Sequence, residues 1–355
     1  MCELLCAGRT ARPISIEPIS MGGRRPLPPF GRKFPPSARD LSKRRTEFVR
    51  MSPTPADEEK LAGFLSPAFD KAAFRVNRRL PLTFICGGKN SGDTAPLRHQ
   101  FLNQISCSPR RILPILAERA FPHQLIERNI QKFEEFLGKT ADCVLIFAES
   151  PGSFAETGMF AALHTIALKT IVINTRREAR EISFLNLGPI KLIRRLSRFD
   201  CAIDLATAAV TDVDATAIVD AITSTYQTYK TALVFQPEDK FIDLPLRLQL
   251  ACVQMAVTVL RAASTPLITA VLRDHFGAVE EDSIERFLSL LTSISLLERE
   301  DELYFVRDAA PFSDDSLICT TQISMPELRV RALEWHAEKN SHVSTFLREK
   351  LGVDI

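Results

Sequence analysis

The sequence predicts an α/β protein with a Rossmann-like or flavodoxin-like parallel sheet, followed by a mainly helical domain. Two observations support this. Short apolar runs of strand length alternate with helix-length amphipathic segments over residues 51–235, which is the pattern of βαβ units. After a break at 236–245 the pattern becomes mainly helical.

Each element of the first part has its own signal. Leu82–Cys86 and Cys143–Phe147 are apolar runs of buried-strand length, and a turn follows each. Gly188-Pro189 opens a helix, because proline suits the first helical position. Gly87-Gly88 is not a dinucleotide fingerprint, since a full G-x-G-x-x-G is missing. The predicted strands are 82–86, 111–115, 143–147, 170–174 and about 201–204; the predicted helices are 57–64, 97–106, 123–137, about 154–168, 189–198 and 215–229.

The second part, residues 244–312, has the components of a winged helix. Helices are predicted at 246–263 and 266–275, and a third has its apolar face on Ile284, Phe287, Leu288, Leu291 and Ile294. Residues 296–306 read as a β-hairpin with an acidic turn. The C-terminal tail, 313–355, is predicted to contain a helix at 326–338.

The first 50 residues differ from the rest in composition. They carry 11 Lys and Arg against 4 Asp and Glu, a net charge of +7, and seven prolines. Such a segment can bury little, so we expect a disordered basic extension. A nucleic-acid-binding arm, an organellar transit peptide and a non-translated extension with a start at Met21 or Met51 are alternatives, of which we favour Met51.

Composition limits the functional classes. No apolar run approaches the ~18 residues of a membrane span. The eight cysteines form no C-x-x-C pair and the histidines show no metal spacing. We therefore expect a cytoplasmic protein without membrane association, structural metal or cofactor.

The most informative segment is Asp142–Gly158, in which a buried strand leads into a turn and a helix. Ligands of open α/β sheets bind outside the carboxyl ends of the strands, so Glu149 and Glu156 are predicted at a ligand site. Glu156 can stabilise or capture an oxocarbenium-like sugar, as glycosidase carboxylates do, and Glu149 can orient hydroxyls or handle protons. The backbone amides of Gly152 and Ser153 are suited to a phosphate or sugar hydroxyl.

Structural alternatives exist for these residues. Ser153-x-x-Glu156 also matches a capping box, and Glu149 can be a solvated loop residue. Arg98 and His99 open the helix after Gly87-Gly88 and can reach a phosphate or ring, although such a pair is usually exposed and idle. Asp142 precedes its strand, which predicts a structural role at the end away from the site.

Charge distinguishes two further segments. Residues 176–198 carry seven Lys and Arg against two Glu, a net of +5, which makes a candidate nucleic-acid surface or simply a solvated basic face. Residues 264–312 carry 4 Lys and Arg against 10 Asp and Glu, a net of −6. That part is too acidic to bind duplex DNA unaided, so protein contact is expected there. The candidate nucleic-acid-binding residues are Lys191, Arg194, Arg195 and Arg198.

Four blocks together resemble a known family. Ile85-Cys-Gly-Gly88, Arg98-His-Gln100, Phe147–Glu156 and Asn186-Leu-Gly-Pro189 occur in the order found in the nucleoside deoxyribosyltransferase-like effectors of bacterial retrons. The resemblance covers roughly residues 51–312. It implies a Rossmann-like N-glycosidase domain, a winged-helix domain, and toxic cleavage of a nucleotide, with NAD as a candidate substrate. It also implies restraint by a partner reverse transcriptase and its RNA–DNA until phage infection, and leaves room for a higher-order assembly.

The same resemblance assigns roles to residues. Glu156 matches the glutamate that attacks the anomeric carbon; Glu149, Gly152 and Ser153 match the surrounding loop, and Gly87 and Gly88 match the first-strand loop. The transferases continue with Leu-Gly where this chain has Thr157-Gly158, so hydrolysis and transfer both remain open. The alternatives are a non-catalytic nucleotide-sensing protein, a winged-helix transcription regulator and a phosphoribohydrolase-like enzyme, which usually carries Pro-Gly-Gly where this chain has Pro151-Gly-Ser153.

Overall fold

The computed structural model describes residues 54–70, 74–89, 95–121, 129–199, 202–235, 239–306, 316–318 and 324–353. The predicted basic extension 1–50 and the first part of the predicted helix 123–137 lie outside these ranges. All elements described below belong to one compact unit, Met51–Ile355.

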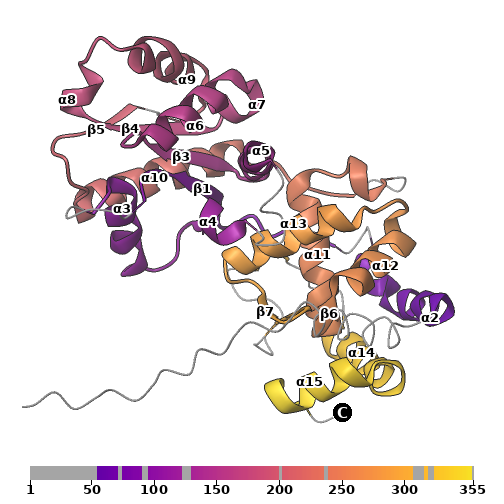
Figure 1. Ribbon diagram of the computed structural model, residues 1–355. Helices are drawn as coiled ribbons and strands as arrows, with labels where there is room; N and C mark the ends of the chain where they lie inside the picture. Colours follow the sequence, from indigo (N-terminus) through magenta and orange to yellow (C-terminus); the bar gives the residue numbers. More distant parts are fainter. Residues whose placement is uncertain are drawn as a thin grey trace, which may run out of the picture. The chain divides into compact units, whose positions relative to one another are not determined.

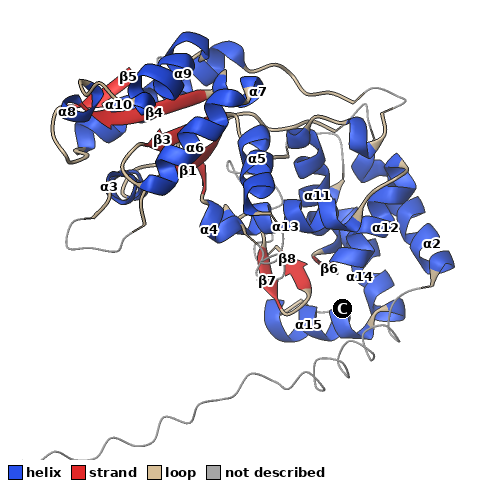
Figure 2. Ribbon diagram, turned by 45° about the horizontal axis from the view of Figure 1, so that its top comes forward, coloured by secondary structure: helices blue, strands red, loops and turns tan. Residues whose placement is uncertain are grey.

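A five-stranded parallel sheet organises the first part of this unit (Figures 1 and 2). Its strands are β1 (Leu82–Cys86), β2 (Leu113–Ile115), β3 (Cys143–Phe147), β4 (Thr170–Thr175) and β5 (Ala202–Leu205). They lie in the order β2-β1-β3-β4-β5, and every neighbouring pair is parallel. The chain moves outward from β1 to β2 and then returns past β1 to β3. This reversal places the topological switch point between β1 and β3, where sheets of this order bind ligands.

Both faces of the sheet are covered, which explains the continuous apolar runs. Ile85, Leu145 and Phe147 face α3 (Leu97–Ser106) and α10 (Asp212–Tyr229). Phe84 and Ile146 belong to the opposite layer, with α5 (Ile130–Thr140) and α6 (Pro151–Ala162). Further along this layer α9 (Lys191–Leu196) packs on β4. The shorter elements are α4 (Ala117–Ala120), α7 (His164–Ala167), α8 (Arg176–Ala179) and the π-helical turn η3 (Asn186–Ile190).

The second part is helical with a small antiparallel sheet. Its order is α11 (Leu246–Leu260), β6 (Ala262–Ser264), α12 (Thr265–Phe276), α13 (Glu281–Ser293), β7 (Glu298–Glu300) and β8 (Leu303–Phe305). The predicted hairpin is confirmed, and β6 completes a three-stranded sheet in the order β6-β8-β7. Helix α11 is its centre, since every residue from Arg247 to Leu260 is buried. Helices α2 (Pro55–Leu65), α14 (Met325–Lys339) and α15 (Ser341–Leu351), and the 3-10 turns η1 (Ser66–Phe69) and η4 (Phe241–Asp243), complete the described elements.

The two parts share one hydrophobic cluster. It includes Phe84 and Ile146 of the sheet as well as Val253 and Leu288 of the helices. Phe136 of α5 also meets Phe287 of α13 with ring centroids 5.4 Å apart. The helical part therefore buries the face of α5 that the sheet leaves uncovered.

Several predicted boundaries are wrong for identifiable reasons. The helix predicted at 246–263 ends at Leu260, because Arg261 adopts a φ of 65° and the next residues pair with β8. The helix predicted from 154 begins at Pro151 and ends at Ala162, and α7 follows Leu163. Pro189 does not start a helix but lies inside η3, just before α9. Within the described ranges, no helix is long and apolar enough to cross a membrane.

Candidate functional site

The candidate site lies at the carboxyl ends of β1 and β3, beside the switch point. Strand β1 ends at Cys86 and continues into Gly87-Gly88, and β3 ends at Phe147 two residues before Glu149. These strands are direct neighbours in the sheet. The two loops and the start of α6 consequently meet at one place, as the sequence predicts.

Glu149 joins the two loops through its carboxylate. Its Oε1 accepts hydrogen bonds from the backbone N–H of Gly88 at 2.9 Å and of Arg98 at 3.1 Å, and its Oε2 accepts one from Leu97. Helix α3 has Pro96 as its N-cap, which offers no side-chain acceptor, so Glu149 supplies the missing acceptor and a favourable charge at the helix start. With its oxygens used in this way, Glu149 holds the site in shape.

Helix α6 begins one turn earlier than the Ser153–Glu156 capping box requires. Ser150 is the N-cap: its Oγ accepts from the Ser153 N–H at 3.2 Å, and the Ser153 Oγ accepts from the Ser150 N–H at 3.0 Å. The Ser153 Oγ also accepts from the Glu149 N–H at 3.1 Å. Pro151 at the first helical position explains the shift. The alternative in which Glu156 caps the helix with Ser153 is therefore wrong, because Ser150 and Ser153 form the capping pair.

Glu156 lies in the second turn of α6 as a half-buried carboxyl group. Its Oε2 is buried and has no hydrogen-bond partner among the described residues. Burial, together with the charges of Glu134 and Glu118, raises the pKa of Glu156 to about 7. The Cys86 thiol and the Arg98 guanidinium act in the opposite direction. A carboxyl group so poorly solvated is costly to keep ionised and reactive once ionised.

Glu134 is the residue of this site that sequence reasoning missed. It comes from α5, is half-buried, and burial raises its pKa. Its signal was present in the sequence: Glu134 follows Phe133 and precedes Leu137 by three positions, so it borders the apolar stripe of its helix. At the border of the stripe the Glu134 carboxyl group is only partly solvated, and its charge acts on Glu156.

Arg98 is engaged more tightly than predicted. Its Nη2 and Nη1 meet the two carboxylate oxygens of Glu118 at 2.8 and 3.2 Å, and its side chain is only 11% exposed. The guanidinium is thus committed to Glu118 of α4, although its buried Nε has no partner among the described residues. Its contribution to the site is a fixed positive charge near Glu156. The expectation of an exposed, idle Arg98 is wrong. His99 follows on α3 and is half-buried.

Gly87 is required by close approach to Arg98. A Cβ placed on Gly87 would lie 2.7 Å from the Arg98 Cβ and 3.0 Å from the Glu149 Oε1. A Cβ on Gly88 would lie 3.3 Å from the Pro96 Cβ. The two glycines therefore allow the β1 loop and α3 to pack closely rather than marking a cofactor fingerprint.

We expect Gly87→Ala to destabilise the protein by about 1–3 kcal/mol, because backbone or α3 must shift to relieve the overlap. Denaturant unfolding measures the effect. Gly158→Ala is the matched control, since a Cβ there meets nothing within 4 Å and alanine favours a helix. Equal stability of the two variants would contradict the close-approach argument.

The remaining predicted ligand groups differ in availability. The Ser153 N–H donates to the Ser150 Oγ, and Ser153 as a whole is only 1% exposed. Gly152 is exposed, so its N–H is the better placed of the two predicted amides. Ser153 supports the loop, and Gly152 presents its backbone to the solvent side.

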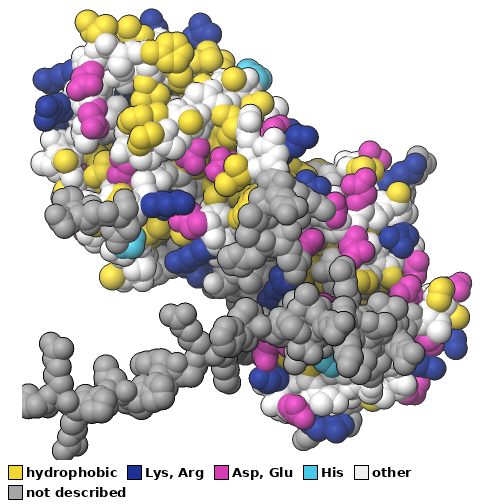
Figure 3. Space-filling model, viewed as in Figure 1, with side chains coloured by type: hydrophobic (Ala, Val, Ile, Leu, Met, Phe, Trp, Pro, Cys, Tyr) yellow, Lys and Arg dark blue, Asp and Glu magenta, His cyan; other side chains and the backbone are white. Residues whose placement is uncertain are grey.

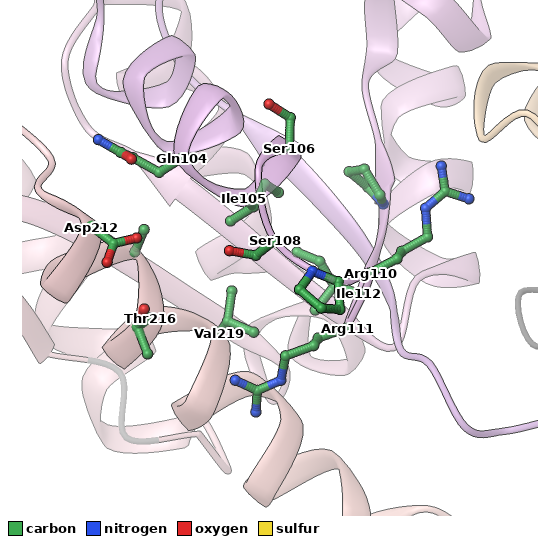
Figure 4. Close-up of a pocket in the computed structure, with 13 residues that line it drawn as sticks. Gln104, Ile105, Ser106, Ser108, Arg110, Arg111, Ile112, Asp212, Thr216 and Val219 are labelled. Atoms are coloured by element: carbon green, nitrogen blue, oxygen red, sulfur yellow. The ribbon is translucent and has the colours of Figure 1, made fainter.

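Two cavities lie away from Glu156. One, of about 310 Å³, is formed by the end of α3, the approach to β2 and the first half of α10, with Ser108, Arg111 and Asp212 among its lining residues (Figure 4). The other, of about 280 Å³, contains Asp142 and lies at the amino ends of the strands. Glu156 lines neither cavity. Among the described residues, no group of three or more His, Cys, Asp or Glu is arranged to hold a metal ion.

Asp142 has the structural role predicted for it. It accepts a hydrogen bond from the Leu82 N–H at 2.8 Å and pairs with Arg78 at 3.0 Å. It also pairs with Arg247 of α11. This buried cluster links the amino end of β1 to the helical part.

The basic segment lies on the surface, as predicted. Lys191, Arg194, Arg195 and Arg198 are all exposed, although Arg194 pairs with Asp204 at 3.1 Å and Arg198 lies over the Tyr229 ring. Figure 3 shows hydrophobic side chains gathered over the region of α6 and α9 on the face in view. Ile182 and Phe184, which precede η3, are 92% and 86% exposed.

The fold and the site together define a class: an α/β protein with a desolvated carboxyl group at the switch point of a parallel sheet. Comparison with known families specifies it further. The family described as "STM3845 retron effector protein" matches residues 94–299, and the chain belongs to that family.

Two curated relatives come from Escherichia coli. The chain is 33% identical over 121 residues to the "Retron Ec73 putative ribosyltransferase/DNA-binding protein", covering 32% of this chain and 38% of that protein. It is 28% identical over 148 residues to the "Retron Ec86 putative ribosyltransferase/DNA-binding protein", covering 41% and 46%. The matches thus span less than half the length of each relative.

Proposed function

We propose that this retron effector is an N-glycosidase that cleaves the N-glycosidic bond of a nucleotide, with Glu156 as the nucleophile. The observation that carries the proposal is the Glu156 carboxyl group, which is desolvated at the switch point and has a buried, unpartnered Oε2. Covalent capture of a sugar needs a carboxylate oxygen that is free to form a bond to the anomeric carbon. Glu149 lacks that freedom, since three amides hold it.

The proposed reaction has two steps. A Glu156 oxygen forms a bond to the anomeric carbon while the glycosidic C–N bond breaks and its electrons leave with the base. Water then displaces Glu156 in a hydrolysis, which gives the sugar hydroxyl, the free carboxylate and a proton released to solvent; in a transfer a second base displaces it. NAD fits as substrate because nicotinamide leaves as a neutral molecule and needs no proton. The relatives' names favour ribosyl transfer in the broad sense.

The second part of the chain supports the effector role in this proposal. The order α11-β6-α12-α13-β7-β8 contains the three helices and the hairpin expected of a winged helix. Its surface is acidic by sequence, which favours a protein partner such as the retron reverse transcriptase. The exposed basic residues of α9 are suited to the retron RNA–DNA. In this proposal the partners hold the toxin inactive until phage infection.

The direct test is base release from NAD and from a panel of nucleosides and nucleotides by purified protein. Release by the wild type and its loss in Glu156→Gln support the proposal. Tight binding without turnover, measured by calorimetry with the partners absent, favours a non-catalytic nucleotide sensor instead.

The pKa of Glu156 predicts a pH dependence. A nucleophilic carboxylate must be ionised, and with a pKa of about 7 about one-tenth of it is ionised at pH 6 and about nine-tenths at pH 8. We therefore expect kcat/KM to rise by nearly tenfold over this range. Glu134→Gln removes a charge that raises the pKa of Glu156, so it should move the acidic limb to lower pH. A flat profile between pH 5 and 8 in the wild type would contradict this assignment.

A further inference from the structure

A second cavity lies at the opposite edge of the sheet from Glu156. It has a volume of about 280 Å³. Its lining residues come from the segments just before β1, β3, β4 and β5 and from the carboxyl ends of α5 and α10. The five-residue strand β3 separates the two edges by about 17 Å.

The cavity is lined mainly by cations. Its lining contains Arg78, Lys139, Lys169, Arg198, Lys230 and Arg247, whereas Asp142 is its only acidic residue. The formal charge of the lining is therefore +5, in a protein whose whole chain carries only +2. Positive charges this close together repel one another, and an anion between them lowers that electrostatic energy.

The partners of these cations leave charge uncompensated. Asp142 is shared by Arg78 and Arg247, so one carboxylate faces two guanidinium groups. The Lys169 ammonium donates to the carbonyl oxygens of Lys139 and Ala141, which are neutral groups. The pKa of Lys169 is lowered to about 8, mainly by burial; the charges of Asp142 and Cys143 oppose the lowering, and the charge of Arg198 adds to it. An anion in the cavity would relieve that repulsion.

The negative carboxyl ends of the neighbouring helices do not compensate the positive charge of the cavity lining. Helices α5, α9 and α10 end near this edge, and each carboxyl terminus carries about half a negative charge, about −1.5 in all. Glu135, which pairs with Lys139, adds another −1. Together these offset only about half of the +5 of the lining. A doubly charged phosphate would neutralise the remainder.

We propose that this cavity binds a phosphate group, contributed either by a free nucleotide or by the 5′-phosphorylated end of a nucleic-acid strand. Arg198 and Lys230 would contact the phosphate, because both are exposed at the cavity while Arg78 and Arg247 are held by Asp142. Tyr229, half exposed beneath Arg198, offers a ring face for the attached base. Arg198 then belongs to this cavity rather than to the α9 surface.

The test uses the full-length protein and calorimetric titration with four probes: inorganic phosphate, AMP, a 5′-phosphorylated oligothymidylate and the same oligonucleotide without its phosphate. The cavity variant is Arg198→Ala/Lys230→Ala. The control, Lys60→Ala/Lys132→Ala, also removes two positive charges, from exposed positions outside both the cavity and the basic α9 surface. Thermal unfolding of both variants checks that they are folded.

We expect the cavity variant to bind the phosphorylated probe at least about tenfold more weakly than the wild type, and the control to bind within about twofold. Binding of AMP and phosphate identifies a free nucleotide as the source, whereas a requirement for the 5′-phosphorylated oligonucleotide identifies a strand end. The proposal is overturned if no probe binds the wild type, if both variants lose affinity equally, or if the unphosphorylated oligonucleotide binds as well as the phosphorylated one.

Discussion

Glu156→Gln is expected to reduce base release at least about 10³-fold, the scale of loss when a covalent nucleophile is removed. Glutamine keeps the size of the side chain but cannot form the glycosyl-enzyme bond. The effect should fall on kcat rather than on KM, since the amide still fills the same half-buried position. Steady-state kinetics with the best substrate of the panel measures it.

The control for this substitution is Glu135→Gln, one residue from Glu134 on α5 and paired with the exposed Lys139. It should retain activity within about twofold, since exposed pairs contribute little. Undiminished base release by Glu156→Gln would remove Glu156 from the chemistry and, with it, the N-glycosidase proposal.

Stability provides an independent readout of the same carboxyl group. Its folded pKa is raised to about 7, so its contribution to stability is fully present below the unfolded value and is lost as the pH rises through about 7. Glu156→Gln removes that loss and should unfold at an equal or higher temperature than the wild type at pH 8. A lower melting temperature would indicate that Glu156 is structural.

Asp142→Ala is expected to have the largest effect on stability, a loss of about 3–5 kcal/mol in the free energy of unfolding. The substitution leaves Arg247, whose side chain is 5% exposed, without its carboxylate partner. It also removes the acceptor of the Leu82 N–H at the start of β1. Equilibrium unfolding in urea measures the loss.

Asp204→Ala is the control, because its pair with Arg194 is about one-third exposed on both sides. We expect a cost of less than about 1 kcal/mol there, as for other solvent-exposed pairs. A similarly small cost for Asp142→Ala would show that the buried cluster does not hold the sheet to α11.

The strands were predictable from sequence because their physical requirement is local. β1 and β3 are almost wholly apolar, are buried on every residue and end in turns, so their bounds, Leu82–Cys86 and Cys143–Phe147, match the prediction. The same holds for α3 and for the hairpin β7–β8. β6 was not predictable, because Ala262–Ser264 continues a helical pattern and becomes a strand only through pairing with β8.

The residue types of the candidate site were predictable from sequence, but the role of each residue was not. The turn after β3 indicated two carboxylates at the ligand edge of the sheet. Sequence by itself also determined the parallel sheet, the change to a helical second part and the basic surface of α9, since these depend on patterns within one segment. Only the tertiary structure decided that Glu149 binds backbone amides of another loop, that Arg98 pairs with Glu118, and that Glu134 adds its charge beside Glu156. These contacts join residues 15 or more positions apart, and their energies depend on burial, which no local pattern specifies.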